Sequence, residues 1–149
     1  QAARHLESGE VQYSLYFVSD CGMMYKFDHL RELTPPYEEL LSTIPLGAEG
    51  DSRTTGFYPP IFVPAGEHVA TKIGIESNRN VFFDFGLYDV REKNGVVYDS
   101  AFRERFYNLD QYASYGLCWI DYLEEVDKEI VWSLPGADST SGTDSDYCN

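Results

Sequence analysis

Apolar and polar side chains alternate along residues 11–18, and this period of two constrains the fold more than any other feature of the chain. One face of the segment would carry Val11, Tyr13, Leu15 and Phe17, and the other Gln12, Ser14 and Tyr16. Successive side chains of a β-strand point to opposite faces of a sheet. The segment therefore predicts a strand with one face buried and the other left for contact with solvent or other molecules.

A turn and a second strand are expected directly after this segment. Residues 19–22 read Ser-Asp-Cys-Gly, and such residues favour turns. Residues 23–27 are again apolar and aromatic. The pattern predicts a returning strand and a β-hairpin.

The middle of the chain predicts further strands. Residues 61–63 and 69–75 are rich in β-branched side chains, and a Ser-Asn-Arg-Asn turn follows them. The next strand would bury alternate residues, namely Val81, Phe83, Phe85 and Leu87. We expect three consecutive strands, at residues 69–75, 81–90 and 96–98, to pair as a meander.

A hairpin is predicted around Asn94 and Gly95, because both residues tolerate the positive φ angles of tight hairpin turns. It would join residues 87–90 to residues 96–98. Further on, Trp, Ile, Val and Tyr favour strands at residues 117–123 and 129–134. A helical stripe is the alternative there, formed by Trp119, Leu123, Val126 and Ile130.

One helix is predicted between Thr34 and Pro45. Thr34 is a suitable N-cap, and Pro35 suits the first helical position. An apolar face follows at the spacing i, i+3, i+4 and i+7, made by Tyr37, Leu40, Leu41 and Ile44. We expect this helix to cover one side or end of a sheet.

Length and composition indicate a single globular domain over residues 1–149. The chain is 43% hydrophobic and 15% aromatic, which is too apolar for a disordered protein. The predicted fold is mainly β, an antiparallel β-sandwich or a jelly-roll-like arrangement, with one or two short helices. Residues 1–10 are interpreted as an N-terminal arm and residues 136–149 as a polar C-terminal tail.

The net charge excludes some classes of partner. Eleven basic residues oppose 25 acidic ones, which gives a formal charge of −14. A nucleic acid backbone would be repelled, since no basic patch interrupts this field. No apolar run is long enough to span a membrane. Solubility is the simplest role of the charge, and an acidic decoy for a nucleic-acid-binding protein is an alternative.

The chain contains three cysteines, which allow one disulfide and one remaining thiol. We predict a disulfide between Cys118 and Cys148 that ties the polar tail to the body, and this leaves Cys21 unassigned. The chain begins with Gln1 and not with methionine, as a processed or excised product would. These features favour an extracellular or cell-surface location.

No catalytic motif is recognised in the sequence. His5, His29 and His68 are scattered, and none belongs to a hydrolase or zinc motif. A two-carboxylate glycoside hydrolase needs only two acids at a fixed separation. The acids nearest the predicted sheet are Asp84, Asp89 and Asp99, of which Asp84 is the strongest candidate because it lies among aromatic residues.

Calcium is the one cofactor that the sequence suggests. Asp138, Asp144 and Asp146 lie in the polar tail, and calcium prefers carboxylate and carbonyl oxygens. An ordered loop pattern is missing from this segment. The alternative is a solvated acidic tail whose serine and threonine residues could carry O-linked sugar.

A limited resemblance supports the extracellular interpretation. Residues 63–66 read Val-Pro-Ala-Gly, and an aromatic strand follows that ends Leu-Tyr-Asp at residue 89. These pieces are similar to parts of bacterial extracellular β-sandwich modules, and they identify no family.

The leading functional hypothesis is a secreted, non-catalytic β-sandwich that acts by protein–protein contact. It would be a self-associating subunit of a surface assembly or fibre, or an adhesion module that binds another protein. Exposed strand edges and terminal arms permit such pairing. Two further hypotheses are a calcium-assisted carbohydrate-binding module and a small two-carboxylate glycoside hydrolase.

Overall fold

The structure is a computed structural model, and it describes residues 1–79, 81, 84–100, 104, 111–133 and 148. The chain divides into two compact units. The first unit comprises Gln1–Phe17 and Lys26–Phe85, and the second comprises Val18–Tyr25 and Gly86–Asn149.

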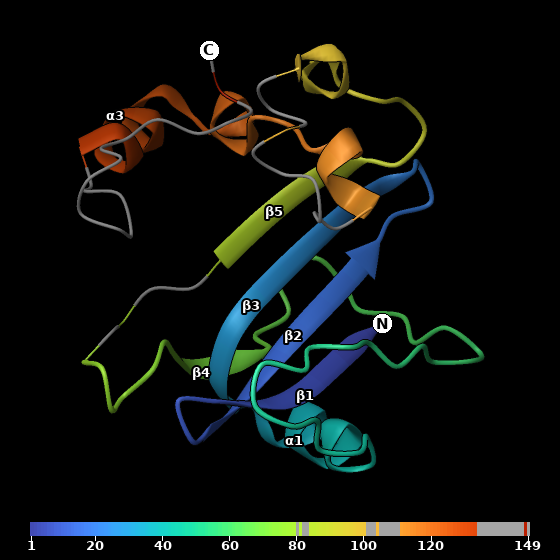
Figure 1. Cartoon of the computed structure of the whole chain (residues 1–149), viewed down its shortest axis with the longest axis vertical. Coiled ribbons are helices and arrows are strands. Elements are labelled where there is room, and N and C mark those ends of the chain that lie inside the picture. Colours follow the sequence, from blue (N-terminus) through green and yellow to red (C-terminus); the bar gives the residue numbers. More distant parts are fainter. Residues whose placement is uncertain (80, 82–83, 101–103, 105–110, 134–147, 149) are drawn as a thin grey trace. The chain divides into compact units, whose positions relative to one another are not determined.

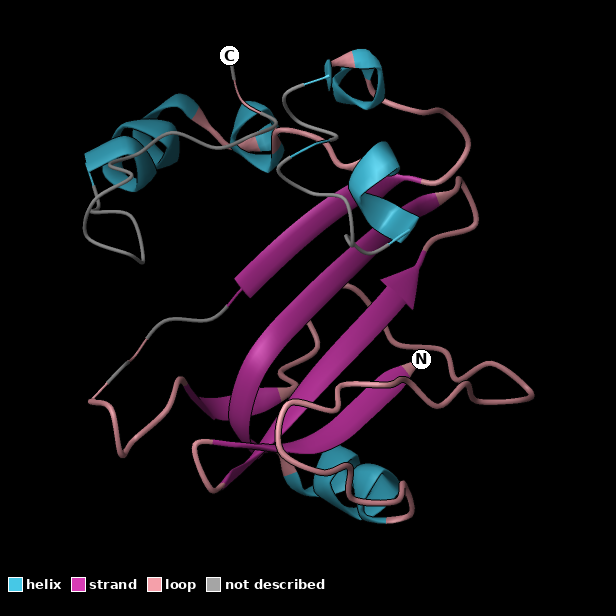
Figure 2. Cartoon of the chain, in the orientation of Figure 1, coloured by secondary structure: helices cyan, strands magenta, loops and turns pink. Residues whose placement is uncertain are grey.

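One five-stranded sheet contains every described strand, and its strands and loops are distinguished in Figure 2. The strands are β1 (Ala2–Glu7), β2 (Glu10–Val18), β3 (Met23–Leu33), β4 (Ala70–Ile73) and β5 (Asp84–Asp89). Their order is β1-β2-β3-β4, and β5 also pairs with β3 (Figure 1). The sheet is open. A β-rich chain with short helices is confirmed, whereas a sandwich or jelly-roll arrangement is not.

The predicted hairpin is confirmed as β2, the turn at residues 19–22 and β3. The predicted meander is wrong, because β4 and β5 each pair with β3 and not with each other. β3 has 11 residues, so it is long enough to serve two short partners. Residues 61–63 form no strand and lie in a loop.

The expected burial of the fifth strand is confirmed in part. Leu87 is buried and Phe85 is half-buried, whereas Val81 lies outside β5 and is exposed. Phe83 lies outside the described residues.

Helix α1 (Pro35–Ser42) is confirmed, and it packs against β1. The Thr34 side chain makes no capping hydrogen bond, and its hydroxyl instead donates to the carbonyl of His68 at 2.9 Å. The predicted apolar face packs into the core of the first unit. The buried residues of this core are Ala2, Leu15, Leu30, Leu33, Tyr37, Leu41 and Ile44.

The sequence predicted that the second face of β2 would be open to solvent or other molecules. This prediction is wrong for part of the strand. Gln12 and Ser14 are fully buried. The Gln12 amide donates to the carbonyl of Gly74 at 3.2 Å, and the Ser14 hydroxyl donates to Asp28 at 2.6 Å. The segment after β4 therefore closes over part of this face.

Residues 2–7 of the expected N-terminal arm form strand β1. Ala2 and Ala3 are fully buried, and the backbone of Ala2 exchanges two hydrogen bonds with Thr55. The backbone N–H groups of Gly47 and Gly50 donate to Arg4 and Leu6. The outer edge of β1 is thus partly covered by the chain itself.

Helical turns dominate the described part of the second unit. They are the 3₁₀-helices η1 (Gly95–Tyr98), η2 (Gln111–Tyr115) and η3 (Trp119–Tyr122), and the helix α3 (Glu125–Ser133). The predicted hairpin at Asn94 is wrong, since Gly95 begins η1. The strands predicted at residues 117–123 and 129–134 are also wrong, and the helical alternative is correct for residues 125–133.

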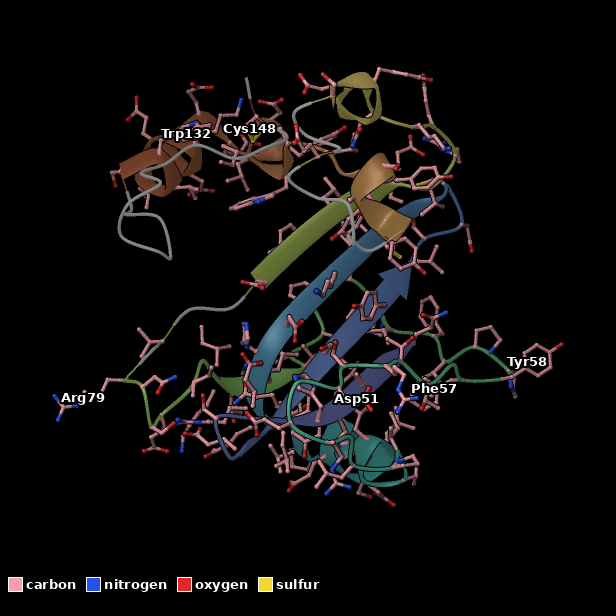
Figure 3. All side chains as sticks on the ribbon, viewed as in Figure 1. Asp51, Phe57, Tyr58, Arg79, Trp132 and Cys148 are labelled. Carbon is pink, nitrogen blue, oxygen red and sulfur yellow. A yellow bond between two sulfur atoms is a disulfide. The ribbon has the colours of Figure 1, made fainter. Side chains whose placement is uncertain are left out.

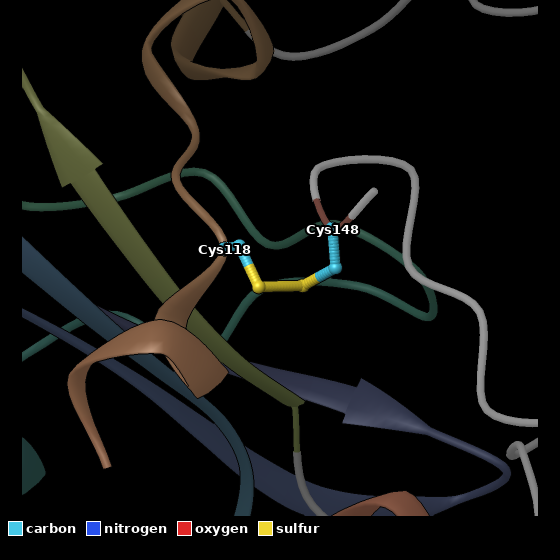
Figure 4. The surroundings of a disulfide bond; sticks show 2 residues. All are labelled: Cys118 and Cys148. Atoms are coloured by element: carbon cyan, nitrogen blue, oxygen red, sulfur yellow. A yellow bond between two sulfur atoms is a disulfide. The ribbon is translucent and has the colours of Figure 1, made fainter. Parts of the chain in front are cut away.

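The predicted disulfide between Cys118 and Cys148 is present in the second unit (Figure 4), with Cα atoms 4.7 Å apart. Cys21 is free and exposed. Among the described residues, no helix combines the length and the hydrophobicity that a membrane crossing requires.

Candidate functional site

An aromatic loop, defined here as residues 56–63, is the most exposed apolar feature of the first unit. Tyr58 is 98% exposed and Phe62 is 88% exposed. Tyr58 lies at the projecting tip of this loop and points away from the ribbon (Figure 3). Large apolar side chains gain free energy by leaving water, so two exposed rings at nearby positions of the chain are suited to contact with another molecule.

The aromatic loop is anchored at both ends. Phe57 and Val63 are half-buried and pack against the core of the first unit. Just before the loop, the backbone of Thr55 exchanges hydrogen bonds of 2.7 and 3.0 Å with Ala2 of β1. Pro59 and Pro60 restrict the backbone between the two exposed rings. The rings therefore sit on a restrained loop, which lowers the entropy lost on binding.

The same prolines limit the chemistry of the aromatic loop. Proline has no backbone N–H, so residues 59 and 60 offer no main-chain donor. Ile61 and Phe62 add only apolar side chains. Sugars need several hydrogen-bond partners beside a stacking ring. The loop is better suited to an apolar recess than to a glycan.

A histidine–carboxylate array is the second feature of the first unit, and it comprises His5, Glu7, His29 and Asp84. One Glu7 carboxylate oxygen lies 3.6 Å from Nε2 of His5 and 3.5 Å from Nδ1 of His29. Nε2 of His29 lies 3.7 Å from an Asp84 carboxylate oxygen. Imidazoles and carboxylates therefore alternate through the array.

Strand pairing and one unusual backbone angle create this array. His5 and Glu7 lie on the same face of β1, because they are two residues apart. His29 adopts a left-handed φ of 57°, which is uncommon for a residue other than glycine. Its backbone N–H donates to the Asp28 carboxylate at 2.9 Å, which supports this conformation. The His29 ring is thereby directed between two carboxylates.

Burial varies strongly along the array. The His5 side chain is 3% exposed and that of Asp84 is 57% exposed. Nδ1 of His5 is buried with no hydrogen-bond partner, and so is Oε1 of its cross-strand neighbour Gln12. The array thus extends from the protein interior to solvent.

Asp28 lies next to the array and is held as a carboxylate. Burial acts to raise the pKa of Asp28, but the Ser14 hydroxyl, the Lys26 ammonium and the His29 N–H together hold this pKa below its ordinary value. The Lys26 nitrogen is 3.1 Å from the Asp28 carboxylate. Asp28 therefore has a structural role on this face of the sheet.

The array can exchange protons, because imidazoles and carboxylates are the usual acid–base groups of proteins. Across the part of the chain that the structure describes, no group of three or more His, Cys, Asp or Glu residues could hold a metal ion. The predicted calcium ligands Asp138, Asp144 and Asp146 lie outside the described residues.

The candidate acids divide between the two units. Asp84 lies in the array and is exposed. Asp89 receives two hydrogen bonds from the Arg91 guanidinium, at 2.8 and 2.7 Å, which lower the pKa of Asp89 to about 2. It is therefore a poor proton donor near neutral pH. Asp99 is exposed in the second unit, and His68 is exposed as expected.

The second unit contains a recess of its own, with a volume of about 420 Å³. Its described lining consists of Val90, Lys93, Tyr112, Ser114 and Tyr115. The Asn94 amide donates to the carbonyls of Ala113 and Gly116, both at 2.9 Å, and fixes the backbone beside it.

Sequence reasoning identified Asp84 as the strongest candidate acid, but it missed the aromatic loop and the assembly of the array. Glu7 was not a candidate, and His5 and His29 are 24 positions apart in the chain. The proximity of the two histidines depends on the pairing of β1, β2 and β3. The Tyr-Pro-Pro-Ile-Phe run was visible in the sequence, but its exposure depends on where Phe57 and Val63 are anchored.

The chain matches no protein-family model, no curated protein and no solved structure. The geometry of the described residues therefore carries the functional inference.

Proposed function

We propose that this protein acts by contact with another protein and that the aromatic loop is its contact element. Tyr58 and Phe62 would enter an apolar recess on the partner. The observation that carries the proposal is the near-complete exposure of two aromatic rings on a loop that is anchored in the core on both sides.

The two exposed rings would supply a large part of the binding free energy. Full burial of one such side chain is worth about 1.5–3 kcal/mol. Interfaces derive most of their affinity from a few such residues, and tyrosine is enriched among them. Because Phe57 and Val63 already restrain the loop, little additional ordering is needed when the partner binds.

A different protein is a better partner than a second copy of this chain. Each copy carries a formal charge of −14, so two copies repel each other. The covered edge of β1 also limits backbone pairing through residues 1–10. We therefore place the proposed adhesion function ahead of self-assembly into a fibre.

An extracellular location is part of this proposal. Disulfides persist in oxidising compartments and are rare in the cytosol. The Cys118–Cys148 bond supports such a location.

A photo-crosslinking amino acid in place of Tyr58 would test the contact function. The matched control is the same replacement at Tyr98, which is 79% exposed in the second unit. We expect position 58 to yield a specific crosslinked protein that position 98 does not yield.

The identified partner is then purified and its affinity measured by calorimetry. Tyr58→Ser combined with Phe62→Ser should weaken binding by about 30-fold or more. Tyr98→Ser should leave the affinity unchanged. Identical crosslinks at both positions, or an unchanged affinity of the double variant, would exclude the loop as the contact element.

The second candidate function is the two-carboxylate hydrolase, and the array favours it over calcium-assisted glycan binding. Glu7 and Asp84 lie at opposite nitrogens of His29, so two acids and one base are within reach of one another. Both carboxylates are partly exposed. Turnover of a polysaccharide panel that is lost in Asp84→Asn and retained in Asp99→Asn would support this candidate. No turnover by the unaltered protein would remove it.

Calcium-assisted glycan binding stays a prediction based on Asp138, Asp144 and Asp146. A glycan array read with and without chelator tests it directly. Binding that depends on calcium and is unaffected by Tyr58→Ser would favour glycan recognition over contact through the aromatic loop.

A further inference from the structure

We infer that the apolar partner surface that contacts the aromatic loop carries a rim of lysine and arginine side chains. This inference rests on the proposed contact function and specifies the chemistry of the partner. Its basis is the charge of the segment that supports the loop, together with the pairing of the one arginine in that segment.

The supporting segment is residues 34–69, which runs from the start of α1 through the aromatic loop. It contains five acids, one arginine and no lysine, a formal charge of −4. The acids are Glu38, Glu39, Glu49, Asp51 and Glu67. All of these residues belong to the first unit.

The side chains of this segment present mainly negative charge to solvent. Glu38, Glu39 and Glu67 are exposed. Arg53 donates two hydrogen bonds to Asp51, at 2.8 and 2.6 Å, and these bonds hold the pKa of the Asp51 carboxyl below its ordinary value. The arginine is thus already matched by a carboxylate.

Glu67 lies close to the base of the aromatic loop. Its backbone N–H donates to the carbonyl of Pro64, directly after the loop, at 3.2 Å. Burial, with a contribution from the nearby Glu67 charge, raises the pKa of Tyr37, which belongs to the core against which Phe57 and Val63 pack. Glu38 follows Tyr37 in α1 and is exposed. The exposed Glu67 carboxylate is therefore beside the support of the loop, and Glu38 is adjacent in sequence to one of its core residues.

An interface with this arrangement selects its partner by charge at its edge. Apolar rings at the centre supply affinity, whereas charged groups at the rim mainly set orientation, association rate and choice of partner. Acidic rims on a partner would be repelled, and anionic membranes and nucleic acids would be repelled in the same way. A basic rim is the complementary choice.

Three synthetic amphipathic helices provide a defined probe for this inference. Each carries the same leucine stripe, and the remaining positions are lysine, glutamine or glutamate. Binding of each labelled peptide to the full chain is measured by fluorescence anisotropy at about 50 and 300 mM salt, across which screening changes strongly. We expect the lysine peptide to bind about tenfold or more tightly than the glutamate peptide.

Two sets of variants separate the effect of the acids near the loop on peptide binding from the effect of the overall charge of the protein. Glu38→Gln, Glu39→Gln and Glu67→Gln together should weaken binding of the lysine peptide by about three- to tenfold and reduce its salt dependence. The matched control is Glu124→Gln, Glu125→Gln and Glu129→Gln, which removes the same charge from exposed positions of the second unit. The control should have a clearly smaller effect.

The outcomes distinguish the inference from the proposed function. If all three peptides bind equally and Tyr58→Ser with Phe62→Ser abolishes binding, the basic rim is excluded and the contact function stands. If the control set weakens binding as much as the rim set, overall charge is responsible and the rim is excluded. If the loop variant leaves the binding of every peptide unchanged, the contact function itself is refuted.

Discussion

The two units of this chain are stabilised in different ways. The first unit buries a continuous group of apolar side chains between its strands and α1. The described part of the second unit consists largely of short helices, and α3 buries none of its residues. The buried apolar side chains in the described part of the second unit are Met24, Leu87, Cys118 and Ile120. Within the described residues, the first unit therefore depends on a core, whereas the second depends more on local hydrogen bonds and a disulfide.

This difference explains where a contact element can be placed. A loop that projects aromatic rings into water needs a rigid base, since the exposed rings contribute nothing to folding. The core of the first unit supplies that base through Phe57 and Val63. Substitutions in each unit test whether the two are stabilised as differently as their burial indicates.

The largest effect is expected from Leu41→Ala. Leu41 is 0% exposed, and its removal would leave a cavity in the core of the first unit. Such substitutions lower the free energy of unfolding by about 2–5 kcal/mol. Urea denaturation would measure the loss, and Leu46→Ala, which changes an exposed leucine, should lower this free energy by less than about 1 kcal/mol. Equal losses would show that α1 is not part of a tight core.

Removal of the disulfide should destabilise the second unit selectively. Cys118→Ser with Cys148→Ser opens a link between positions 30 residues apart, which is worth about 3.6 kcal/mol in the chain-entropy account. Hydrogen exchange should accelerate in residues 111–133, while β1 and α1 stay protected. Acceleration of the same size in β1 would show that the two units do not differ in this way.

Acidification should act on the first unit through Asp28. Because the pKa of Asp28 is lower in the folded chain than in the unfolded chain, its contribution is present above the unfolded pKa of 3.8 and is lost as the pH falls through the lower folded value. Urea midpoints at about pH 5 and pH 3 measure this slope. Asp28→Asn should flatten the slope, and an unchanged slope would contradict the role of Asp28.

The smallest effect is expected from Ile130→Ser on α3. Ile130 is 55% exposed, so the substitution should change the free energy of unfolding by no more than about 0.5 kcal/mol. Thermal denaturation would detect a larger change. A loss above about 1.5 kcal/mol would mean that Ile130 is buried in solution. The two units would then differ less in how much apolar surface they bury.

The parts of the fold that were predicted correctly have strong local signals. Alternation at residues 11–18 and the following turn predicted the β2–β3 hairpin. Thr34, Pro35 and the apolar spacing of Tyr37 and Leu41 predicted α1. In these cases neighbouring residues contain the information, because backbone periodicity is a local property.

The incorrect predictions concern segments whose structure depends on distant residues. β4 and β5 were expected to pair with each other, but both pair with β3. A strand was expected at residues 129–134 because their side chains favour strands. Strand propensity largely reflects packing on a sheet, and the described residues 125–133 form helix α3 instead. The alternation of β2 correctly placed Gln12 and Ser14 on one face. It gave no indication that Gly74, after β4, would accept a hydrogen bond from Gln12 or that Asp28, on β3, would accept one from Ser14.

The candidate site shows the same division. The acidic charge and the Tyr-Pro-Pro-Ile-Phe run can be read from the chain itself, and the preferred disulfide between Cys118 and Cys148 was confirmed only by the structure. The proximity of Glu7, His29 and Asp84 required four strands, β1, β2, β3 and β5, to pair in one order. The exposure of Tyr58 required Phe57 to be anchored in a core.

Reading the residues in order was enough to establish which segments are periodic, which charges the protein carries and that its three cysteines allow one disulfide. Three-dimensional packing was needed to establish which strands became neighbours, which polar side chains were buried and which aromatic rings stayed in water. The physical reason is that periodicity and charge are properties of adjacent residues, whereas pairing and burial are set by competition among segments far apart in the chain.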